Sequence, residues 1–283
     1  MMQSTGSGAS WLAANLDGKT LTAWAVTGGT AGPAQVLHLQ DHSKTAVAAG
    51  LRQALAGSTL PVVLGGSGLA APQAVPAEPA KLPLTRARLE ELTVHALPGL
   101  SQSAPAGLIQ AAAARLTGFL RLNPEWDGVV CLPGTFVTHW VQVSAREAVS
   151  FQSALSGRLA AAVARQMVME ATGEWDKAAL TEAAADGISK PELLAARLAS
   201  VQAAAALGQL TSEAARGRLW GLLLGAELAA ARPYWLGQNV ALLAEAPLEP
   251  LYAATLEAQA LPVTLADSRR MTLEGLTRAW SAS

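Results

Sequence analysis

The sequence predicts an α/β protein of two similar domains with a central cleft and a helix-rich C-terminal half. Three observations predict this fold class. Each half opens with short apolar runs separated by turn residues, long alanine- and leucine-rich segments with helical spacing follow in the second half, and the chain closes with strand–helix–strand–helix alternation. Such alternation with short connections favours a parallel strand pair with a crossover helix. We expect an N-terminal domain over 11–122 and a C-terminal domain over 123–283.

Composition excludes several classes of protein. Of the 283 residues, 51% are hydrophobic and only 14% are charged, so a large core is expected and disorder is not. The net charge of −1, without a long basic run, argues against nucleic acid as the partner. The single cysteine, Cys131, excludes an internal disulfide and a multi-cysteine metal site. No targeting segment or bilayer-spanning stretch is visible, so we expect a cytoplasmic protein without a membrane partner.

The first domain begins with two strands, Trp11–Leu16 and Leu21–Val26, around the turn Asp17-Gly18-Lys19. The turn residues interrupt two apolar runs, which is typical of a hairpin. The other elements expected here are a strand at Val36–Leu39, a helix capped by Asp41 or Ser43 and ending near Ala56, strands at Leu60–Leu64 and Glu91–Leu97, an irregular loop over 70–84 and a helix at Ala106–Leu122.

The second domain begins with a predicted hairpin over Val129–Val143. Pro133-Gly134-Thr135 separates two β-rich runs, and proline and glycine preset the backbone angles of a tight turn. Backbone N–H groups at a hairpin tip favour anions, and the hydroxyl of Thr135 adds a donor. From these residues alone, an ordinary structural hairpin and an anion-binding turn both remain open.

After a strand at Arg146–Ser150, alanine and leucine at helical spacing dominate the chain. Glycine and proline residues separate the segments. The expected elements are helices at 153–171, 176–186, 190–207 and 212–232, a strand at Val240–Ala244, a helix at Leu248–Gln259, a strand at Leu261–Leu265 and a helix at Arg269–Trp280.

An ordered set of motifs resembles the 2-dehydro-3-deoxygalactonokinases, sugar-acid kinases of the superfamily of actin, hexokinase and the Hsp70 ATPase domain. The resemblance covers about residues 11–280, and no single motif in it is specific. The motifs that carry it are Leu132-Pro133-Gly134-Thr135 with Trp140-Val141, Phe151 through Ser156-Gly157, Leu222–Glu227, Leu21 with Ala23-Trp24, and Pro98-Gly99-Leu100.

The resemblance implies two ribonuclease-H-like domains, the second with a helical insertion, and nucleotide bound between them. It implies transfer of the γ-phosphoryl group of ATP to the 6-hydroxyl of 2-dehydro-3-deoxygalactonate, with Mg²⁺. A sugar acid and a nucleotide would be the partners, and a homodimer is left open. Gly134 and Thr135 would form one phosphate-binding turn, and Gly18, Lys19 and Thr20 the other.

The sequence departs from the family at several polar positions. The family aspartate at the end of the first strand is Asn15 here, so Asp17 would be the metal ligand only with a shifted turn. The family's two acids before the mid-chain helix are replaced at Ala111-Ala112, and Gly157-Arg158 stands in place of a Gly-Glu pair. These losses motivate an alternative, a catalytically impaired relative that binds nucleotide or sugar acid, or regulates.

Three further features have a structural and a functional interpretation. His139 shares its strand parity with Val137 and Val141, which favours a core or sheet-face histidine over a catalytic one. Gly65-Gly66-Ser67-Gly68 follows a strand but lacks the lysine and spacing of a P-loop. Glu227 would either line a nucleotide cleft or sit at the boundary of its helix. The sequence names no general base.

Overall fold

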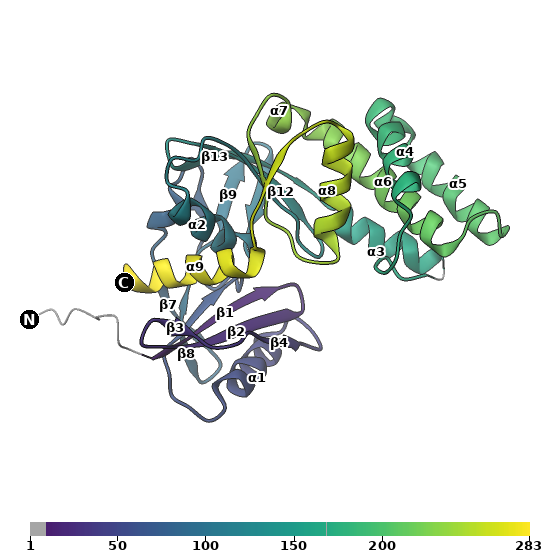
Figure 1. Ribbon diagram of the computed structural model, residues 1–283. Helices are drawn as coiled ribbons and strands as arrows, with labels where there is room; N and C mark the ends of the chain where they lie inside the picture. Colours follow the sequence, from purple (N-terminus) through teal and green to yellow (C-terminus); the bar gives the residue numbers. More distant parts are fainter. Residues whose placement is uncertain (1–9, 168) are drawn as a thin grey trace, which may run out of the picture. The chain divides into compact units, whose positions relative to one another are not determined.

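The structure is a computed structural model that describes residues 10–167 and 169–283 (Figure 1). Two compact units divide the chain. The first consists of the residues up to Asp127 together with Val143–Ser150 and Asp267–Ser283, and the second of Gly128–Gln142 and Phe151–Ala266. The C-terminal helix thus belongs to the same unit as the first strand.

The first unit is built on a mixed sheet with the order β3-β2-β1-β5-β8-β7 and β4 paired to β2. Strands β1 and β2 form an antiparallel hairpin. Strand β5 pairs with β1 in parallel, and β8 pairs with β5 in parallel. The strands of this sheet are β1 (Trp11–Asp17), β2 (Thr20–Thr27), β3 (Thr30–Ala31), β4 (Gln35–His38), β5 (Val62–Gly65), β7 (Thr85–Leu89) and β8 (Leu92–Ala96).

Alternation along β1 gives this sheet two covered faces. Leu12, Ala14 and Leu16 point into a core shared with the amphipathic helix α1 (Lys44–Leu55), which Ser43 caps at its N-terminus. On the other parity, Trp11 stacks on Trp280 of α9 (Ser268–Ser281) with ring centroids 5.6 Å apart. The sheet is therefore buried between α1 and α9.

Helix α2 (Ala112–Leu122) packs closely against α9 because glycines lie where the two helices cross. A Cβ at Gly275 would lie 1.9 Å from the carbonyl oxygen of Ala114, and one at Gly118 would lie 1.8 Å from that of Met271. Smaller elements complete the unit: β6 (Gln73–Ala74), β9 (Leu100–Ser103) and β10 (Ala106–Ile109) in a three-stranded sheet, and a 3₁₀ turn at Pro79–Lys81.

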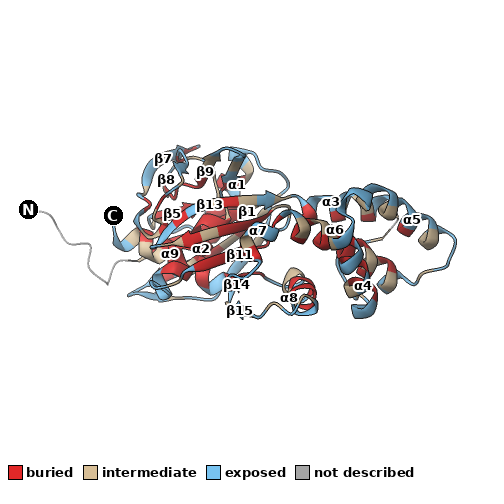
Figure 2. Ribbon diagram, turned by 90° about the horizontal axis from the view of Figure 1, so that it is seen from above, coloured by how far each residue is buried: buried red, intermediate tan, exposed pale blue. Residues whose placement is uncertain are grey.

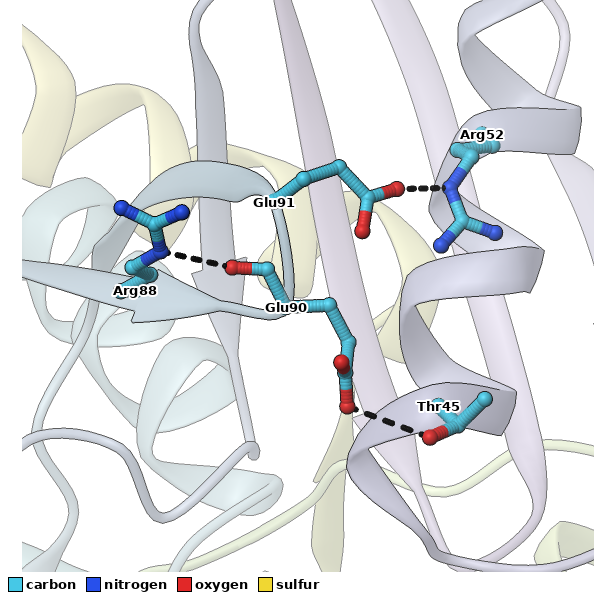
Figure 3. A network of polar contacts seen from close by, with 5 residues as sticks. All are labelled: Thr45, Arg52, Arg88, Glu90 and Glu91. Atoms are coloured by element: carbon cyan, nitrogen blue, oxygen red, sulfur yellow. Dashed lines mark hydrogen bonds and ion pairs between the residues drawn. The ribbon is translucent and has the colours of Figure 1, made fainter.

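A polar network on the surface ties the β7–β8 turn to α1 (Figure 3). Thr45 donates to Glu90 at 3.1 Å, and Arg52 forms an ion pair with Glu91. Arg88 donates to the backbone carbonyl of Glu90 at 2.9 Å. These groups are exposed, so water screens the charges and the network fixes the turn more than it stabilises the unit.

A second sheet has the order β13-β12-β11-β14-β15 and lies mostly in the second unit, apart from the parts of β12 and β13 within Val143–Ser150. Its strands are β11 (Gly128–Leu132), β12 (Thr138–Ser144), β13 (Glu147–Ala154), β14 (Val240–Leu242) and β15 (Val263–Leu265), with β11, β14 and β15 parallel. In the first sheet, β1, β2 and β3 are joined by short connections and lie side by side, and β5 on the other side of β1 is parallel to it. In the second sheet, β11, β12 and β13 are likewise joined and adjacent, and β14 on the other side of β11 is parallel to it. This shared order confirms the predicted α/β class with two related sheets.

Helices make up most of the second unit. They are α3 (Ser156–Gln166), α4 (Lys177–Ser189), a 3₁₀ turn at Pro191–Leu193, α5 (Leu194–Ala206), α6 (Ser212–Ala230), α7 (Arg232–Trp235) and α8 (Leu248–Ala258). Gly217, Gly221 and Gly225 recur every four residues on α6, and a Cβ at Gly221 would lie 2.3 Å from the carbonyl oxygen of Leu180 on α4. Figure 2 shows α6 largely buried and α5 largely exposed.

Several predicted boundaries are wrong. The expected helix over Ala106–Leu122 is strand β10 followed by α2, and the expected helix over 153–171 begins only after β13 ends at Ala154. The loop expected over 70–84 contains β6 and a 3₁₀ turn, and β7 and β9 were not predicted. Among the described residues, no helix is both long and apolar enough to cross a bilayer.

Candidate active site

The first predicted phosphate turn joins β1 to β2. Asp17 pairs with Thr20, and Gly18 at φ 59° supplies the positive φ that a two-residue hairpin loop requires. The ammonium group of Lys19 donates to the carbonyl oxygen of Gln40 at 2.7 Å, and His42 Nδ1 lies 3.0 Å from the carbonyl oxygen of Gly18. The turn is therefore held against the segment that precedes α1, with Lys19 directed to a backbone acceptor.

Asn15 and Asp17 lie on one face of β1, because alternate residues of a strand share a face. The side chain of Asn15 is 8% exposed, and its Oδ1 has no hydrogen-bond partner among the described residues. This oxygen points across to β5, since a Cβ at Gly65 would lie 2.5 Å from it. A buried amide oxygen without a partner is costly and calls for a ligand.

The donors on this face fit Mg²⁺ in kind. Mg²⁺ prefers hard oxygen ligands and usually binds through one or two protein groups, with phosphate oxygens and water completing the octahedron. Asn15 Oδ1 and the carboxylate of Asp17 are two such oxygens on adjacent same-face positions. Among the described residues, no group of three or more His, Cys, Asp or Glu side chains could hold a metal ion. A metal here would therefore depend on ligands from the nucleotide.

The second predicted phosphate turn joins β11 to β12. The N–H of Gly134 donates to the carbonyl oxygen of Val137 at 3.1 Å and closes the turn. Gly134 itself is buried, whereas Thr135 is exposed. Within the described chain, neither the backbone N–H nor the hydroxyl of Thr135 donates a hydrogen bond. The turn therefore presents these donors to the surface while its glycine amide is engaged internally.

The first turn of α3 packs directly on this second turn. A Cβ at Gly157 would lie 2.4 Å from the carbonyl oxygen of Thr135, so only glycine permits the contact. The next amide, that of Arg158, donates to the carbonyl oxygen of Phe136 at 3.2 Å. The Arg158 guanidinium lies over the Phe136 ring, 5.2 Å from its centroid. The cation of Arg158 therefore lies beside the turn.

Glu227 on α6 lies in the core of the second unit rather than on a helix boundary or in a cleft. It is 5% exposed and accepts hydrogen bonds from Trp140 Nε1 at 2.9 Å, from the Ser156 hydroxyl, and from Tyr252 Oη at 3.0 Å. Burial raises the pKa of Glu227, and the three donors oppose this rise. Burial and the neighbouring carboxyl raise the pKa of Tyr252 well above its usual value.

One of the other sequence interpretations is confirmed. His139 is 6% exposed, with Nδ1 2.8 Å from the hydroxyl of Ser153 and its ring edge-on to Phe151, so it is a satisfied histidine of the sheet. Cys131 is completely buried in β11.

The Gly65–Gly68 segment has a packing reason for its glycines. A Cβ at Gly66 would lie 2.0 Å from the carbonyl oxygen of Leu16, and Gly66 and Gly68 have φ values of 75° and 68°. The close approach of this segment to β1 and to the start of α2 therefore requires glycine. An anion held by this segment stays a prediction.

Sequence analysis did not identify the hydrogen-bonded group around Glu227. The four side chains come from α6, β12, α3 and α8, so no local pattern joins them. One signal was present: an acid within the apolar run Leu222–Leu228 must be paired if it is buried. Ser156 lies in the motif Phe151–Gly157, and its neighbours in sequence give no sign of a carboxyl partner.

Comparison with known proteins gives consistent results. A sequence model of the family described as 2-keto-3-deoxy-galactonokinase matches residues 16–279. A probable 2-dehydro-3-deoxygalactonokinase of Rhizobium meliloti (strain 1021) is 29% identical over 195 residues, which is 66% of this chain and 63% of that protein. The match thus spans somewhat less than two thirds of the curated relative.

Solved structures with the same fold extend the comparison. The crystal structure of a putative 2-dehydro-3-deoxygalactonokinase from Sinorhizobium meliloti covers 95% of both chains with a TM-score of 0.84 and 23% identity. Component A of (R)-2-hydroxyglutaryl-CoA dehydratase from Acidaminococcus fermentans aligns over 98% of this chain with a TM-score of 0.58 and 9% identity, covering 100% of that chain. The fold is shared by all three. The family match over most of the sequence decides the assignment: the chain belongs to the 2-keto-3-deoxy-galactonokinase family.

Proposed function

We propose that this protein is a kinase that transfers the γ-phosphoryl group of ATP to the 6-hydroxyl of 2-dehydro-3-deoxygalactonate. The observation that carries the proposal is the family match over residues 16–279. The comparisons give no support to the alternative of a catalytically impaired relative. In this proposal, the departures from the family motifs change which groups bind the phosphates and the metal, and the class of reaction stays the same.

Phosphoryl transfer needs positioning and charge stabilisation more than covalent chemistry, so backbone donors and oxygen ligands can supply much of it. We assign Gly134 and Thr135 to one phosphate-binding turn, supported by the unpartnered donors of Thr135. Gly18, Lys19 and Thr20 form the other turn in this proposal. Lys19 would exchange its bond to Gln40 for a phosphate oxygen.

Asn15 and Asp17 would hold Mg²⁺ in this proposal. The support is the unpaired, buried Oδ1 of Asn15 and the carboxylate of Asp17 on the same face of β1. When bound, Mg²⁺ neutralises charge that develops on the phosphate oxygens. The chain itself orients the phosphates through N–H donors at the two turns.

The proposal is tested by measuring ADP release from ATP and Mg²⁺ in the presence of 2-dehydro-3-deoxygalactonate. We expect substrate-dependent turnover and a product phosphorylated at the 6-hydroxyl, identified by ³¹P NMR. The matched control is the 6-deoxy analogue, which presents the same carboxylate without an acceptor and should give no ADP. Failure to release ADP with the sugar acid, from a folded protein that still binds ATP, would contradict the proposal.

A further inference from the structure

The hydrogen-bonded group of Glu227, Trp140, Ser156 and Tyr252 is not explained by a contribution to stability alone. Among the described residues, no basic side chain forms an ion pair with Glu227, although the carboxyl is almost completely buried. Burying a carboxyl and three polar partners costs solvation that an apolar cluster of the same shape would not lose. Polar groups kept in a core are often those that fix one arrangement of the elements around them.

The first arm of this group reaches the 133–137 turn through α3. Ser156 donates to Glu227 and is the first residue of α3. The next two residues make the contacts with the turn described above: the close approach of Gly157 to Thr135 and the bond from the Arg158 amide to Phe136. A shift of Ser156 would therefore be transmitted to the turn over one or two residues.

The second arm reaches the residue that directly follows the same turn. Tyr252 donates to Glu227 and also contacts the hydroxyl of Thr138, which is 1% exposed. Thr138 directly follows Val137, whose carbonyl oxygen accepts the Gly134 amide and closes the turn. One carboxyl thus connects to the middle of a five-residue turn through α3 and to the residue after the turn through Tyr252.

We propose that Glu227 is a positioning residue for the 133–137 turn, which it holds through Ser156 at the start of α3 and through Tyr252 and Thr138 at the end of the turn. The consequence is a fixed direction for the free donors of Thr135. That these donors bind phosphate rests on the proposed function, whereas the positioning itself does not.

Two amides report the position of the turn directly. The Gly134 amide exchanges only when the turn opens, and the Arg158 amide only when α3 separates from it. We expect Ser156→Ala and Thr138→Val to accelerate hydrogen exchange at both amides by about tenfold or more, without nucleotide present. The Leu243 amide, bonded to the carbonyl oxygen of Cys131, is the internal reference and should keep its rate.

The matched control is Thr255→Val. Thr255 is as buried as Thr138, at 1% exposure, but its hydroxyl bonds to the carbonyl oxygen of Leu251 within α8. The same hydroxyl-to-methyl exchange there should leave the Gly134 and Arg158 amides unchanged. If Ser156→Ala perturbs folding, as shown by faster exchange at Leu243, Thr138→Val with its isosteric side chain decides the question.

Kinetics provide the second readout. With the turn less fixed, we expect the KM for ATP to rise about fivefold or more in Ser156→Ala and Thr138→Val, with kcat changed less, while Thr255→Val matches the wild type. Exchange and KM values equal to those of Thr255→Val in both variants would overturn the positioning role. Faster exchange in a protein without kinase activity would instead sustain the positioning role and reject the proposed function.

Discussion

The side chain of Glu227 has a consequence for stability because its pKa is raised by burial. Between the unfolded pKa near 4.5 and the raised folded pKa, Glu227 binds more protons in the folded protein than in the unfolded chain, so its contribution to stability is greatest below 4.5 and is lost as pH rises through the folded pKa. We expect Glu227→Gln to flatten this fall, because the amide does not titrate.

This is measured by urea unfolding of wild type and Glu227→Gln at several pH values from about 4.5 upward. As pH rises, the unfolding free energy of the wild type should decrease relative to that of Glu227→Gln. A constant difference across the range would show that the carboxyl does not titrate differently in the two states.

A second prediction at the residue scale concerns metal dependence. Asn15→Asp replaces a neutral oxygen ligand with the charged one that Mg²⁺ binds more strongly. We expect the Mg²⁺ concentration for half-maximal kinase activity to fall about tenfold, which is a change of roughly 1.4 kcal/mol in binding. Asp17→Asn should raise this concentration by a similar factor.

The control for these two variants is Glu192→Gln, which removes an exposed carboxylate in the second unit without changing β1. It should leave the Mg²⁺ titration as in the wild type. Were Asn15→Asp and Asp17→Asn also to leave the titration unchanged, these oxygens would not be the metal ligands.

At the scale of elements, the α2–α9 contact depends on its two glycines. Gly275→Ala would place a Cβ against the carbonyl oxygen of Ala114, and the two helices would have to separate. We expect a destabilisation of about 1–3 kcal/mol from overpacking, which exceeds the roughly 1 kcal/mol that alanine contributes to helix propensity. Thermal and urea unfolding monitored by circular dichroism measure it.

Thr277→Ala on the same helix is the control, because it changes a partly exposed residue and creates no close contact. Its effect should lie within about 0.5 kcal/mol of zero. A stabilised Gly275→Ala protein would mean that α2 and α9 do not pack as closely as the glycines indicate.

An element of the fold could be predicted where neighbouring residues in the sequence determine it. The β1–β2 hairpin was predicted correctly because Asp17-Gly18-Lys19 interrupts two apolar runs. The start of α2 was not, because Ala106–Ile109 and Ala112–Leu122 share apolar residues that suit a strand or a helix, and only the pairing of β10 with β9 decides between them.

The same reasoning applies to the candidate site. Turn residues such as Gly18 and Gly134 carry a local signal, so both turns could be named from the sequence. The partners of Glu227 could not, because Trp140, Ser156 and Tyr252 lie 87, 71 and 25 residues away along the chain. The unpaired oxygen of Asn15 likewise depends on β5 beside it rather than on its neighbours in sequence.

At the scale of the whole molecule, the C-terminal helix completes a unit that the first strand begins. Met271 and Leu276 of α9 are buried, and Trp280 stacks on Trp11. Burying such side chains stabilises by about 1.5–3 kcal/mol each, against a typical total of about 5–15 kcal/mol. We expect a variant that ends at Ala266 to lose the cooperative folding of the first unit.

Limited proteolysis with mass spectrometry tests this expectation by comparing cleavage in 10–127 with cleavage in 151–266. The shortened variant should be cleaved rapidly in the first range and remain resistant in the second. A variant that lacks only Ala282 and Ser283 is the control and should resist in both. Equal resistance in the variant ending at Ala266 would show that α9 is dispensable.

The division of the chain also sets an order during synthesis on the ribosome. The second unit ends at Ala266, whereas the first still lacks Asp267–Ser283, so the later-encoded body can finish first. Nascent chains generally fold from the N-terminus onward, and here the strands encoded before the second unit must wait for residues translated after it. Until then the face of β1 that carries Trp11 stays uncovered, which makes the emerging first unit a natural client for chaperones.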